Sequence, residues 1–591
     1  MSAVESDELW MLHNARDSET TILLPSSEIS VVTTMPSTSA SESEDMSYRN
    51  RVAQSSVKCL AIITFLVTAA VLAPDWFGGI SEVAEPTPAE LPLDGDLWWE
   101  DKEKAADDLP LLGHSNPPPD HGYTLEALHD KITALPGLNL DLNFNMFAGY
   151  FTVSEDNRRS IFYWYVESQN DPSSDPVVFW TNGGPGCSGL IGFGQEHGPF
   201  HFSKDGVISL NPYSWNTVAN MLYVEIPAGV GFSFSDVPED MKNVGDEETA
   251  ADNLIVVEEF FKRFPERLVN EFYISSESYG GHYIPQLAKK NIETMATPGF
   301  DIRFKGFLVG NPWVDPFTND VAQVRSFFQH GLISLPMMND WLSKCSERAT
   351  YDHNRCPKGI NRMRKNMKSV SPYALDYPIC TENKVNLDDA ASSQVLHFLN
   401  QTATKDQYPR SNDLPRFLPP DVKYLPCAEQ HFKVWLNQKV VQEALHVHID
   451  DASKLIRWHA CAPSKDLSYR DEDFLQSQIP IFRELIALLK QGDLHLSLLV
   501  FSGDNDSVCS TSSTQAWIYD LGVDPLPGRD WHEWTIERQT AGFVTKFDLG
   551  KKSRSTCMFS FATIHGAGHE AAAYRPIEAL ELFKRYLSGD L

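Results

Sequence analysis

The stretch Ile274-Ser-Ser-Glu-Ser-Tyr-Gly-Gly-His-Tyr-Ile-Pro285 joins a run typical of a strand to a helical pattern at a corner of small residues, where Ser278 lies. A sharp strand-to-helix turn lifts a serine hydroxyl out of a sheet and points the next backbone N–H at the same place, as nucleophilic acyl transfer requires. Gly280 satisfies the small position two residues after the serine, whereas Ser276 replaces the usual glycine two residues before it. The stretch therefore predicts a nucleophile elbow, with an ordinary strand-helix loop as the open alternative.

The composition is that of a large, acidic and mostly globular chain. With 591 residues, 42% of them hydrophobic, the chain can bury a sizeable core, and this length is consistent with roughly two to four domains. The formal charge of −31 argues against nucleic-acid binding, which needs a basic surface. Acidity is also typical of proteins that work in acidic compartments.

The cysteines indicate an oxidising environment. Nine occur, at positions 59, 187, 345, 356, 380, 427, 461, 509 and 557. The eight that follow Cys59 form an even set without CxxC spacing, which favours disulfides formed in a lumen over a zinc site. We therefore expect no metal site, and the spacing alone leaves the pairing open.

The first 58 residues are rich in Ser, Thr and Glu, with few aromatic residues and no sustained periodicity. Such a segment buries too little apolar surface to offset the entropy of ordering, so we expect residues 1–58 to form a disordered cytosolic tail. Within the tail, the residues from Glu19 to Leu23 and Leu24 resemble the acidic dileucine sorting signals that bind vesicle-coat adaptors. Matches of this length also arise by chance, so a sorting adaptor is a partner only if the tail faces the cytosol.

An uncharged run from Cys59 to Ala73 follows, and further apolar residues extend it to Ile80. The run is short for a membrane span, which needs about 20 residues, and it fits a signal-peptide core of about 7–15 residues. Basic residues precede it and no Lys or Arg follows until Lys102, so the N-terminus should stay cytosolic. Two interpretations of residues 59–80 stay open: an uncleaved type II transmembrane signal-anchor, or a signal peptide cut after Ala73.

Residues 81–121 contain many prolines and acidic residues, which predicts a stalk, and order should begin near Tyr123 in a main domain of residues 122–591. Strand-like runs that give way to strand-helix alternation predict a mixed, mostly parallel sheet flanked by helices. These runs are Gly149–Val153, Ser160–Val166, Pro176–Trp180, Asn220–Val224, Glu271–Ser275, Ile302–Gly310 and Leu496–Ser502. Between about 313 and 427 a helical and loop-like pattern predicts an inserted cap, with a glycosylation sequon at Asn400.

Two further segments supply the partners that Ser278 needs. Leu499-Val-Phe-Ser-Gly-Asp-Asn-Asp506 places acidic residues at the end of a predicted strand, and His565-Gly-Ala-Gly-His569 places a histidine on a glycine-rich loop before a final amphipathic helix. The order serine, aspartate, histidine is that of α/β-hydrolases and differs from the order in other serine hydrolase folds. Together the three segments predict a triad, whereas His569 alone would more often be a loop or cap histidine.

A fourth segment, Trp180-Thr-Asn-Gly-Gly-Pro-Gly-Cys-Ser-Gly189, makes the prediction specific. With it, the chain from about residue 123 to 587 resembles the serine carboxypeptidase family, of the carboxypeptidase Y and cathepsin A-like kind. Other segments that carry the resemblance are Ile161-Phe-Tyr-Trp-Tyr-Val-Glu-Ser168, Asn211-Pro-Tyr-Ser-Trp-Asn216, Pro227-Ala-Gly-Val-Gly-Phe-Ser-Phe-Ser235, Val309-Gly-Asn-Pro312 and Trp435-Leu-Asn-Gln-Lys-Val-Val-Gln-Glu-Ala-Leu-His446. The resemblance implies an α/β-hydrolase fold and cleavage at the C-terminus of peptides.

The resemblance also implies the catalytic roles. Ser278 would be the nucleophile, His569 the general acid and base, and Asp506 the acid that orients the histidine. In the family's G-D-x-D segment the second aspartate has this role, so Asp504 would not be the triad acid.

Two further sets of residues would hold the substrate, according to the resemblance. The oxyanion hole would use the backbone N–H groups of Gly184 and Tyr279, since backbone approaches a ligand closely only where no Cβ intervenes. The family positions that bind a free C-terminal carboxylate are Asn182, Gly183, Glu196 and Glu277, with Trp180 packed beside them. Two glutamates can hold an anion if they share a proton, because like charges in a desolvated site raise one pKa. Activity on peptides should therefore favour acidic pH.

The family's disulfide framework implies the pairs Cys187–Cys461, Cys345–Cys356 and Cys380–Cys427. Cys509 and Cys557 remain, and parity favours a Cys509–Cys557 bridge, although some relatives keep a free thiol near the triad acid. Asn505-Asp-Ser507 is formally a sequon, but a glycan there would block the site, so we expect it to be empty. Glu570 stands where several relatives have methionine, which leaves the preference on the leaving side open.

We therefore expect a serine carboxypeptidase that needs no cofactor and acts on peptides and proteins through an acyl-enzyme. An acyltransferase on the same scaffold is one alternative, but such relatives tend to alter the carboxylate-binding residues, which are retained here. A lysosomal protective or scaffold protein is another, and the intact triad argues against a purely structural role. The expected location is the membrane or lumen of the endomembrane system, in a vacuole or lysosome, or the extracellular space. A homodimer stays open.

Overall fold

The computed structural model describes residues 122–591 except 155, 157, 205, 296–298, 300, 382–423, 449–455, 493 and 551–556. The predicted tail, hydrophobic segment and stalk (residues 1–121) lie outside these residues, as do the dileucine-like sequence at Glu19, Leu23 and Leu24 and the sequon at Asn400. Among the helices that are described, none has the length and apolar character needed to cross a membrane.

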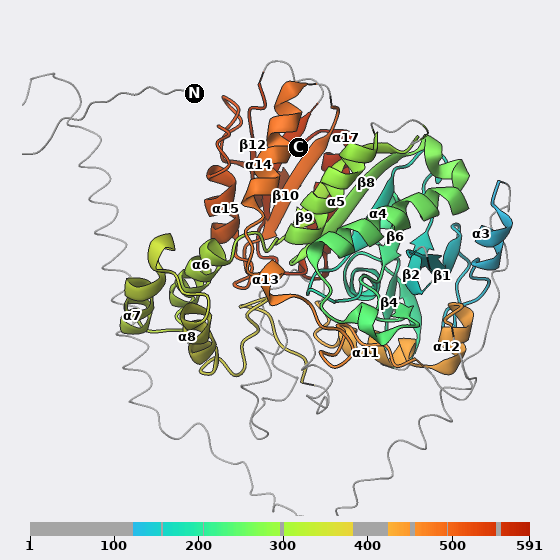
Figure 1. The fold of residues 1–591 in the computed structure, drawn as a ribbon, viewed down its shortest axis with the longest axis horizontal. Coiled ribbons are helices and arrows are strands. Elements are labelled where there is room, and N and C mark those ends of the chain that lie inside the picture. Colours follow the sequence, from blue (N-terminus) through green and yellow to red (C-terminus); the bar gives the residue numbers. More distant parts are fainter. Residues whose placement is uncertain are drawn as a thin grey trace, which may run out of the picture. The chain divides into compact units, whose positions relative to one another are not determined.

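A mixed sheet forms the centre of the described domain (Figure 1). Its strands and a separate hairpin of β4 and β5 are β1 (Met146–Thr152), β2 (Arg159–Val166), β3 (Val177–Thr181), β4 (Phe200–Phe202), β5 (Ile208–Leu210), β6 (Asn220–Val224), β7 (Phe234–Ser235), β8 (Glu271–Glu277), β9 (Arg303–Gly310), β10 (Ser497–Gly503), β11 (His532–Ile536), β12 (Gln539–Lys546) and β13 (Met558–Ile564). The order is β1-β2-β6-β3-β8-β9-β10-β13-β12-β11, and β7 pairs with β2. The six strands from β6 to β13 in this row run parallel, and antiparallel strands flank them on both sides. The predicted mixed, mostly parallel sheet is confirmed.

Helices cover both faces of the sheet. The helices of the described residues, including those that lie away from these faces, are α3 (Leu125–His129), α4 (Asp246–Arg263), α5 (Gly280–Met295), α6 (Pro316–Gln329), α7 (Leu335–Cys345), α8 (Arg355–Arg364), α11 (Ala428–Leu436), α12 (Lys439–Ala444), α13 (Asp471–Phe474), α14 (Ile479–Gln491), α15 (Thr511–Tyr519), α16 (Ala571–Tyr574) and α17 (Pro576–Ser588). Short irregular helices are η1 (Gly192–Glu196), η2 (Trp215–Thr217), η3 (Pro238–Met241), η4 (Pro265–Val269) and η5 (Arg348–Thr350).

The alternation of side chains along the strands creates two cores. On β2, Tyr163 and Tyr165 face a core that includes buried residues of α4, α5, α14 and α15, whereas Phe162 and Trp164 face a core with α11 and α17. Successive residues of a strand point to opposite faces, so a strand that is apolar at every position must be covered on both sides. This is why these strands read as continuous apolar runs in the sequence.

The parallel strands bring distant segments to one edge of the sheet. β3, β8, β9, β10 and β13 are neighbours that run in the same direction. Directly after β3, β8 and β9 come Asn182, Ser278 and Asn311, and the loops that follow β10 and β13 carry Asp506 and His569. Ligands of open α/β sheets bind at this edge, so the topology itself assembles a candidate site.

The described part of the predicted cap consists of α6, α7 and α8, which lie side by side in Figure 1. These helices share a small core of their own that contains Val324, Phe327, Trp341 and Ile360. The disulfide Cys345–Cys356 joins the end of α7 to the start of α8. Because Ile360 also borders a pocket at Ser278, these helices lie over the carboxyl edge of the sheet.

Candidate active site

The turn at Ser278 has the geometry of a nucleophile elbow. β8 ends at Glu277, Ser278 adopts a φ of 59°, and α5 begins at Gly280. This left-handed conformation is strained for a residue with a side chain. Two hydrogen bonds hold it, from the Ser278 N–H to the Gly310 carbonyl (3.0 Å) and from the Trp313 N–H to the Ser278 carbonyl (2.7 Å). The serine borders two pockets.

The same turn accounts for the serine at position 276. A Cβ added to Gly280 would lie 2.1 Å from the Ser276 Oγ, so the turn has room for a side chain at only one of these two positions. Ser276 occupies that space and Gly280 leaves it open. The departure from G-x-S-x-G is therefore compatible with the elbow.

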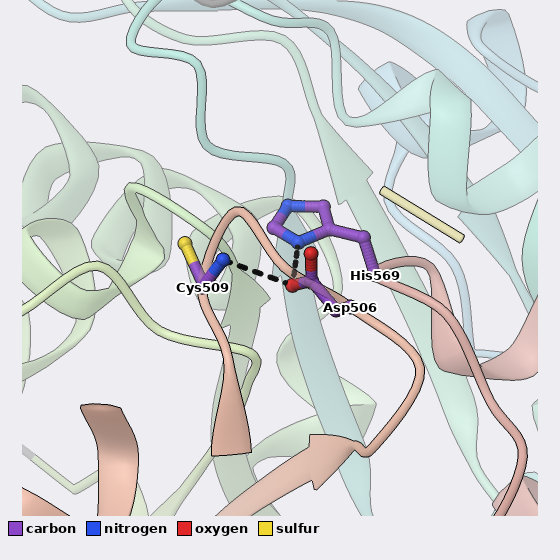
Figure 2. A group of neighbouring side chains, drawn as sticks. All are labelled: Asp506, Cys509 and His569. Carbon is purple, nitrogen blue, oxygen red and sulfur yellow. Dashed lines mark hydrogen bonds and ion pairs between the residues drawn. The ribbon is translucent and has the colours of Figure 1, made fainter. Parts of the chain in front are cut away.

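Asp506 orients His569 (Figure 2). Its Oδ2 lies 2.6 Å from the His569 Nδ1 and also accepts hydrogen bonds from the Cys509 N–H (3.1 Å) and the Asn311 Nδ2 (3.0 Å). Its Oδ1 accepts a hydrogen bond from the Val508 N–H (2.7 Å). Because a carboxylate only accepts, His569 donates from Nδ1, and the Nε2 of the neutral ring is left as an acceptor for a proton.

Tyr373 also contacts His569, and the surroundings of the His569 ring raise its pKa. Its backbone N–H donates to the Tyr373 carbonyl (2.8 Å), and the two rings meet edge to face at 5.0 Å between centroids. Burial alone would lower the pKa of His569, but the charge and hydrogen bond of Asp506 outweigh it and raise the pKa above the ordinary value. The ring can therefore take up a proton readily during a reaction at the adjacent serine.

Asp504, the other acidic residue in this loop, lies elsewhere. It accepts hydrogen bonds from the His565 Nδ1 (2.7 Å) and the Gly566 N–H (2.6 Å), and the side chain of His565 is 65% exposed. The structure thus brings Asp506, and not Asp504, to His569.

Asp506, Cys509 and His569 lie close enough for their ligand atoms to fall within 4.8 Å of one another, as a metal site would require. However, the two carboxylate oxygens of Asp506 already accept hydrogen bonds from four N–H donors, one of which belongs to His569. Asp506 therefore orients His569 and does not present a free oxygen to an ion. The Cys509 thiol hydrogen-bonds with Ser278, and burial together with the charges of Asp506 and Glu277 raises its pKa. A protonated thiol is a poor metal ligand.

The loop after β3 packs directly on the elbow. A Cβ at Gly183 would lie 2.3 Å from the Tyr279 nitrogen and 2.7 Å from the Glu277 carbonyl oxygen. Gly184 has a φ of +112°, which favours glycine. Gly184 and Tyr279 both border the pocket that contains Ser278, so their backbone lies where an oxyanion hole is required.

A carboxyl pair lies on the other side of Ser278. The Asn182 Nδ2 donates to the Glu196 Oε1 and to the Glu277 Oε1, both at 3.0 Å, and the Asn182 Oδ1 accepts from the Trp180 Nε1 (2.8 Å). All four side chains are buried. Burial raises the pKa of Glu196 to about 7, and burial with the charge of Glu196 raises the pKa of Glu277. The pair is therefore arranged to share a proton.

Glu196, Glu277 and His569 border a cavity of about 500 Å³, together with Glu429 and Glu570. Burial and the charges of Glu196 and Glu429 raise the pKa of Glu570 to about 8. The sequence drew attention to Glu570 without giving it a role, and it gave no signal for Glu429.

A second, smaller pocket of about 70 Å³ also borders Ser278. Its walls include the side chains of Tyr279, Trp313, Ile360 and Phe474. Sequence reasoning missed this pocket because α8 and α13 supply part of it, and neither contains a recognisable motif.

Asn311 is a further site residue that the sequence left without a role. It follows β9, adopts a φ of 38°, and donates from Nδ2 to Asp506 and to the Gly503 carbonyl (3.2 Å), while its Oδ1 accepts from the Gly503 N–H (2.9 Å). It thereby fixes the end of β10 and the adjoining loop that carries Asp506. The segment Val309-Gly-Asn-Pro312, which carries part of the family resemblance, was the available signal.

Three disulfides are present as the resemblance implied: Cys187–Cys461, Cys345–Cys356 and Cys380–Cys427. The predicted Cys509–Cys557 bridge is wrong. Cys509 follows the carboxyl end of β10, whereas Cys557 precedes the amino end of the parallel strand β13 and donates to the Leu494 carbonyl (2.8 Å). Opposite ends of neighbouring seven-residue strands are about 20 Å apart, far beyond the span of a disulfide.

The elbow, the histidine and the aspartate at the carboxyl edge of this sheet define a hydrolase of the α/β-hydrolase fold. Comparisons with known proteins agree. A profile of the serine carboxypeptidase family matches residues 136–589. Serine carboxypeptidase-like 22 of Arabidopsis thaliana is 35% identical over 474 residues, which are 79% of this chain and 94% of that protein. Serine carboxypeptidase-like 26 of the same plant is 35% identical over 470 residues, 78% of this chain and 94% of that protein.

Among solved structures, Kex1(delta)p, a prohormone-processing carboxypeptidase from Saccharomyces cerevisiae, superposes with a TM-score of 0.58 at 21% identity, over 78% of this chain and 96% of that one. This likeness supports the fold. The chain belongs to the serine carboxypeptidase family.

Proposed function

We propose that the protein is a serine carboxypeptidase that removes C-terminal amino acids from peptides and proteins through an acyl-enzyme. Ser278 Oγ attacks the carbonyl of the last peptide bond while the His569 Nε2 accepts its proton, and Asp506 stabilises the imidazolium. The oxyanion accepts hydrogen bonds from the N–H groups of Gly184 and Tyr279. His569 then protonates the leaving amino group, the C–N bond breaks, and the shortened peptide remains on Ser278 as an ester.

Water completes the cycle. A water molecule loses a proton to His569 as its oxygen attacks the ester carbonyl. The ester C–O bond breaks, His569 returns the proton to Ser278 Oγ, and the shortened peptide leaves with a new C-terminal carboxylate. The new terminus is the same chemical group that the site bound at the start, so the product is a substrate for another round.

The single observation that carries this proposal is the carboxyl pair beside the nucleophile. Glu196 and Glu277 are 5% and 6% exposed, both accept a hydrogen bond from Asn182, and both border the cavity at Ser278. A protonated carboxyl donates a hydrogen bond to a substrate carboxylate, which places the last peptide bond, and no other, at the serine. An internal peptide bond offers no carboxylate to this pair.

The experiment that tests the proposal compares blocked dipeptides with their C-terminal amides at about pH 5. Release of the free C-terminal amino acid from the acid, with little cleavage of the amide, supports a carboxypeptidase. Equal cleavage of both substrates contradicts it. Conversion of an ester only when an alcohol or amine acceptor is present would instead identify the acyltransferase alternative.

We also propose that this domain works in the lumen of the endomembrane system or outside the cell, with residues 59–80 as signal-anchor or signal peptide. The disulfides Cys187–Cys461 and Cys345–Cys356 support an oxidising compartment. Carbonate extraction of membranes tests the anchor, because an anchored protein stays in the pellet. A soluble lumenal species that begins near residue 74 would support the signal peptide instead.

A further inference from the structure

Asp246 is a carboxylate that contacts the residue after Ser278 and has no role in the proposed reaction. Asp246 is the first residue of α4 and is 6% exposed. Its Oδ1 accepts hydrogen bonds from the hydroxyl groups of Tyr279 (3.0 Å) and Tyr469 (2.7 Å). Its Oδ2 accepts from the His282 Nδ1 (2.8 Å) and the Gln286 Nε2 (3.0 Å). Both oxygens are therefore fully satisfied by donors from side chains of two separate segments.

The surroundings of Asp246 favour its ionised form. Burial alone would raise the pKa of Asp246, but the hydrogen bond and charge of His282, with the hydroxyls of Tyr469 and Tyr279, outweigh burial and lower it. The first turn of α4 has a positive end of the helix dipole, which acts in the same direction. Hydrogen bonds to a charged acceptor are about twice as strong as neutral ones, so the four contacts form a rigid anchor.

Three of the four donors come from the chain directly after the nucleophile. Tyr279 follows Ser278, and His282 and Gln286 lie on the first two turns of α5. The Tyr279 ring also stacks on the His282 ring at 4.3 Å between centroids. Fixing this ring fixes the rotation of the Tyr279 residue, whose N–H is a proposed donor of the oxyanion hole.

The fourth donor connects the elbow to the smaller pocket. Tyr469 lies beside Val244, whose N–H donates to the Ser468 carbonyl (3.0 Å). The same segment leads to Phe474, whose ring lies parallel to the Tyr279 ring at 5.8 Å and borders the pocket. One carboxylate thus anchors both the Tyr279 side chain, next to the proposed oxyanion hole, and the segment that leads to Phe474 in the wall of the smaller pocket.

We propose that Asp246 is the positioning residue of the nucleophile elbow, which fixes Tyr279 so that the oxyanion hole is formed before the substrate arrives. The inference rests on the acyl-enzyme reaction proposed above. A carboxylate with a purely structural role would change stability alone. A positioning carboxylate changes the rate at which Ser278 is acylated, because a preformed oxyanion hole acts on the transition state more than on the bound substrate.

The test uses the full chain with four single variants and one double variant. Asp246→Asn removes the charge at nearly constant shape, and Tyr279→Phe and Tyr469→Phe each remove one donor. Asp252→Asn is the matched control, because Asp252 is also on α4, is also 6% exposed, and binds Arg159 instead (2.9 and 3.1 Å). The measurements are the rate of Ser278 labelling by a fluorophosphonate, the kcat and KM for a blocked dipeptide, and the Tm.

We expect Asp246→Asn to lower the labelling rate and kcat about 10- to 100-fold, with KM within about threefold of the unmodified enzyme. Each tyrosine variant should lower kcat about fivefold. Combining Asp246→Asn with Tyr279→Phe should add little, since both changes remove the same contact. Asp252→Asn should lower the Tm and leave the labelling rate unchanged.

The inference is overturned if Asp246→Asn lowers the Tm as Asp252→Asn does but keeps the labelling rate within twofold. Should Asp246→Asn fail to fold, the two tyrosine variants decide, because full activity in both contradicts positioning. Failure of the carboxypeptidase proposal is distinguishable. An enzyme that is labelled at Ser278 but cleaves no peptide removes that proposal, while the labelling rates still measure the role of Asp246.

Discussion

The two pockets that meet at Ser278 differ in size and in charge. The cavity beside Asn182 has a volume of about 500 Å³ and is bordered by the four glutamates Glu196, Glu277, Glu429 and Glu570. The pocket beside Trp313 has a volume of about 70 Å³ and mainly apolar walls. Among the described residues, no Lys or Arg borders the larger cavity, whereas Arg364 borders the smaller one.

In the proposed reaction this difference gives the substrate a direction. The larger cavity, which contains the carboxyl pair, would receive the C-terminal residue that leaves, and charge would govern what it accepts. The smaller pocket would receive the residue whose carbonyl is attacked, and shape and apolar contact would govern what it accepts. The proposed exopeptidase specificity thus follows from the asymmetry of two pockets around one nucleophile.

The largest effect is expected where the two pockets meet. Ser278→Ala should abolish hydrolysis, and Asp506→Asn should lower kcat by about 10⁴-fold, because the histidine loses its orienting acid. Asp504→Asn should leave most of the activity, since Asp504 binds the exposed His565. Steady-state kinetics on one blocked dipeptide measure all three. A greater loss for Asp504→Asn than for Asp506→Asn would reassign the triad acid.

The boundary between the pockets should be the next most sensitive place. In Gly183→Ala the new Cβ would lie 2.3 Å from the Tyr279 nitrogen, so the loop after β3 must move away from the elbow. We expect kcat to fall about 100-fold, as for the loss of an oxyanion donor. Gly522→Ala is the control: its Cβ meets nothing within 4 Å and its φ is +75°, so it should lower the Tm and spare kcat. Comparable kcat values for the two variants would contradict this role of the loop.

The sequence predicts one half of this site better than the other. Apolar runs identify β3, β8, β9 and β10, and the parallel order of these strands brings together the residues that follow them. β13, which precedes His569, was not predicted as a strand, and His569 was predicted instead from its glycine-rich loop and from the order serine, aspartate, histidine. The smaller pocket depends on how α8 and α13 pack against the elbow, which no local pattern encodes. The hydrogen bonds of Asn311 to Asp506 and of Asp246 to Tyr279 join segments that are far apart in the sequence, so no local pattern predicted them either.

Two predictions from cysteine number and residue composition missed features that the topology of the sheet determines. Counting cysteines suggested a Cys509–Cys557 bridge, but parallel strands place the two residues at opposite edges of the sheet. The β11–β12 hairpin was also not predicted, since its strands are partly exposed and carry polar residues between the apolar ones. Such edge strands take their conformation from pairing with β13 more than from their own sequence.

A smaller effect is expected from the carboxyl pair in the larger cavity, which is proposed to bind the C-terminal carboxylate of the substrate. Burial raises the pKa of Glu196 to about 7, so the pair gains its first negative charge as the pH rises through that value. The charge of Glu196 raises the pKa of Glu277, so the remaining shared proton is lost only at higher pH. The KM for a peptide acid should then rise, by about tenfold for each further pH unit if one proton is required. The KM for the matched peptide amide should change little, because the amide has no charge to repel.

Glu277→Gln separates the proton from the shape of the site. Glutamine keeps a donor and removes one negative charge, so the variant should bind the peptide acid less well than the unmodified enzyme at about pH 5 and lose less affinity toward pH 8. The KM of both substrates is measured against pH in both proteins. Parallel KM profiles for the acid and the amide would rule out carboxylate recognition by this pair.

The smallest expected effect concerns the side chain of the leaving residue. Burial and the charges of Glu196 and Glu429 raise the pKa of Glu570 to about 8, so Glu570 is neutral at acidic pH and becomes an anion as the pH rises through that value. An arginine or lysine at the C-terminus would offset this charge, whereas a leucine would not. The ratio of kcat/KM for arginine over leucine should therefore rise about fivefold between pH 6 and pH 9, the range of one partly solvated ion pair.

Because the ratio compares two peptide acids, the effect of losing the shared proton at Glu196 and Glu277 cancels. In Glu570→Gln the ratio should stay near its value at pH 6 as the pH rises, and Asp504→Asn serves as the control with an unchanged profile. A ratio that rises equally in Glu570→Gln and in the unmodified enzyme would show that another carboxylate reads the leaving side chain, and Glu429→Gln would then be the variant to measure.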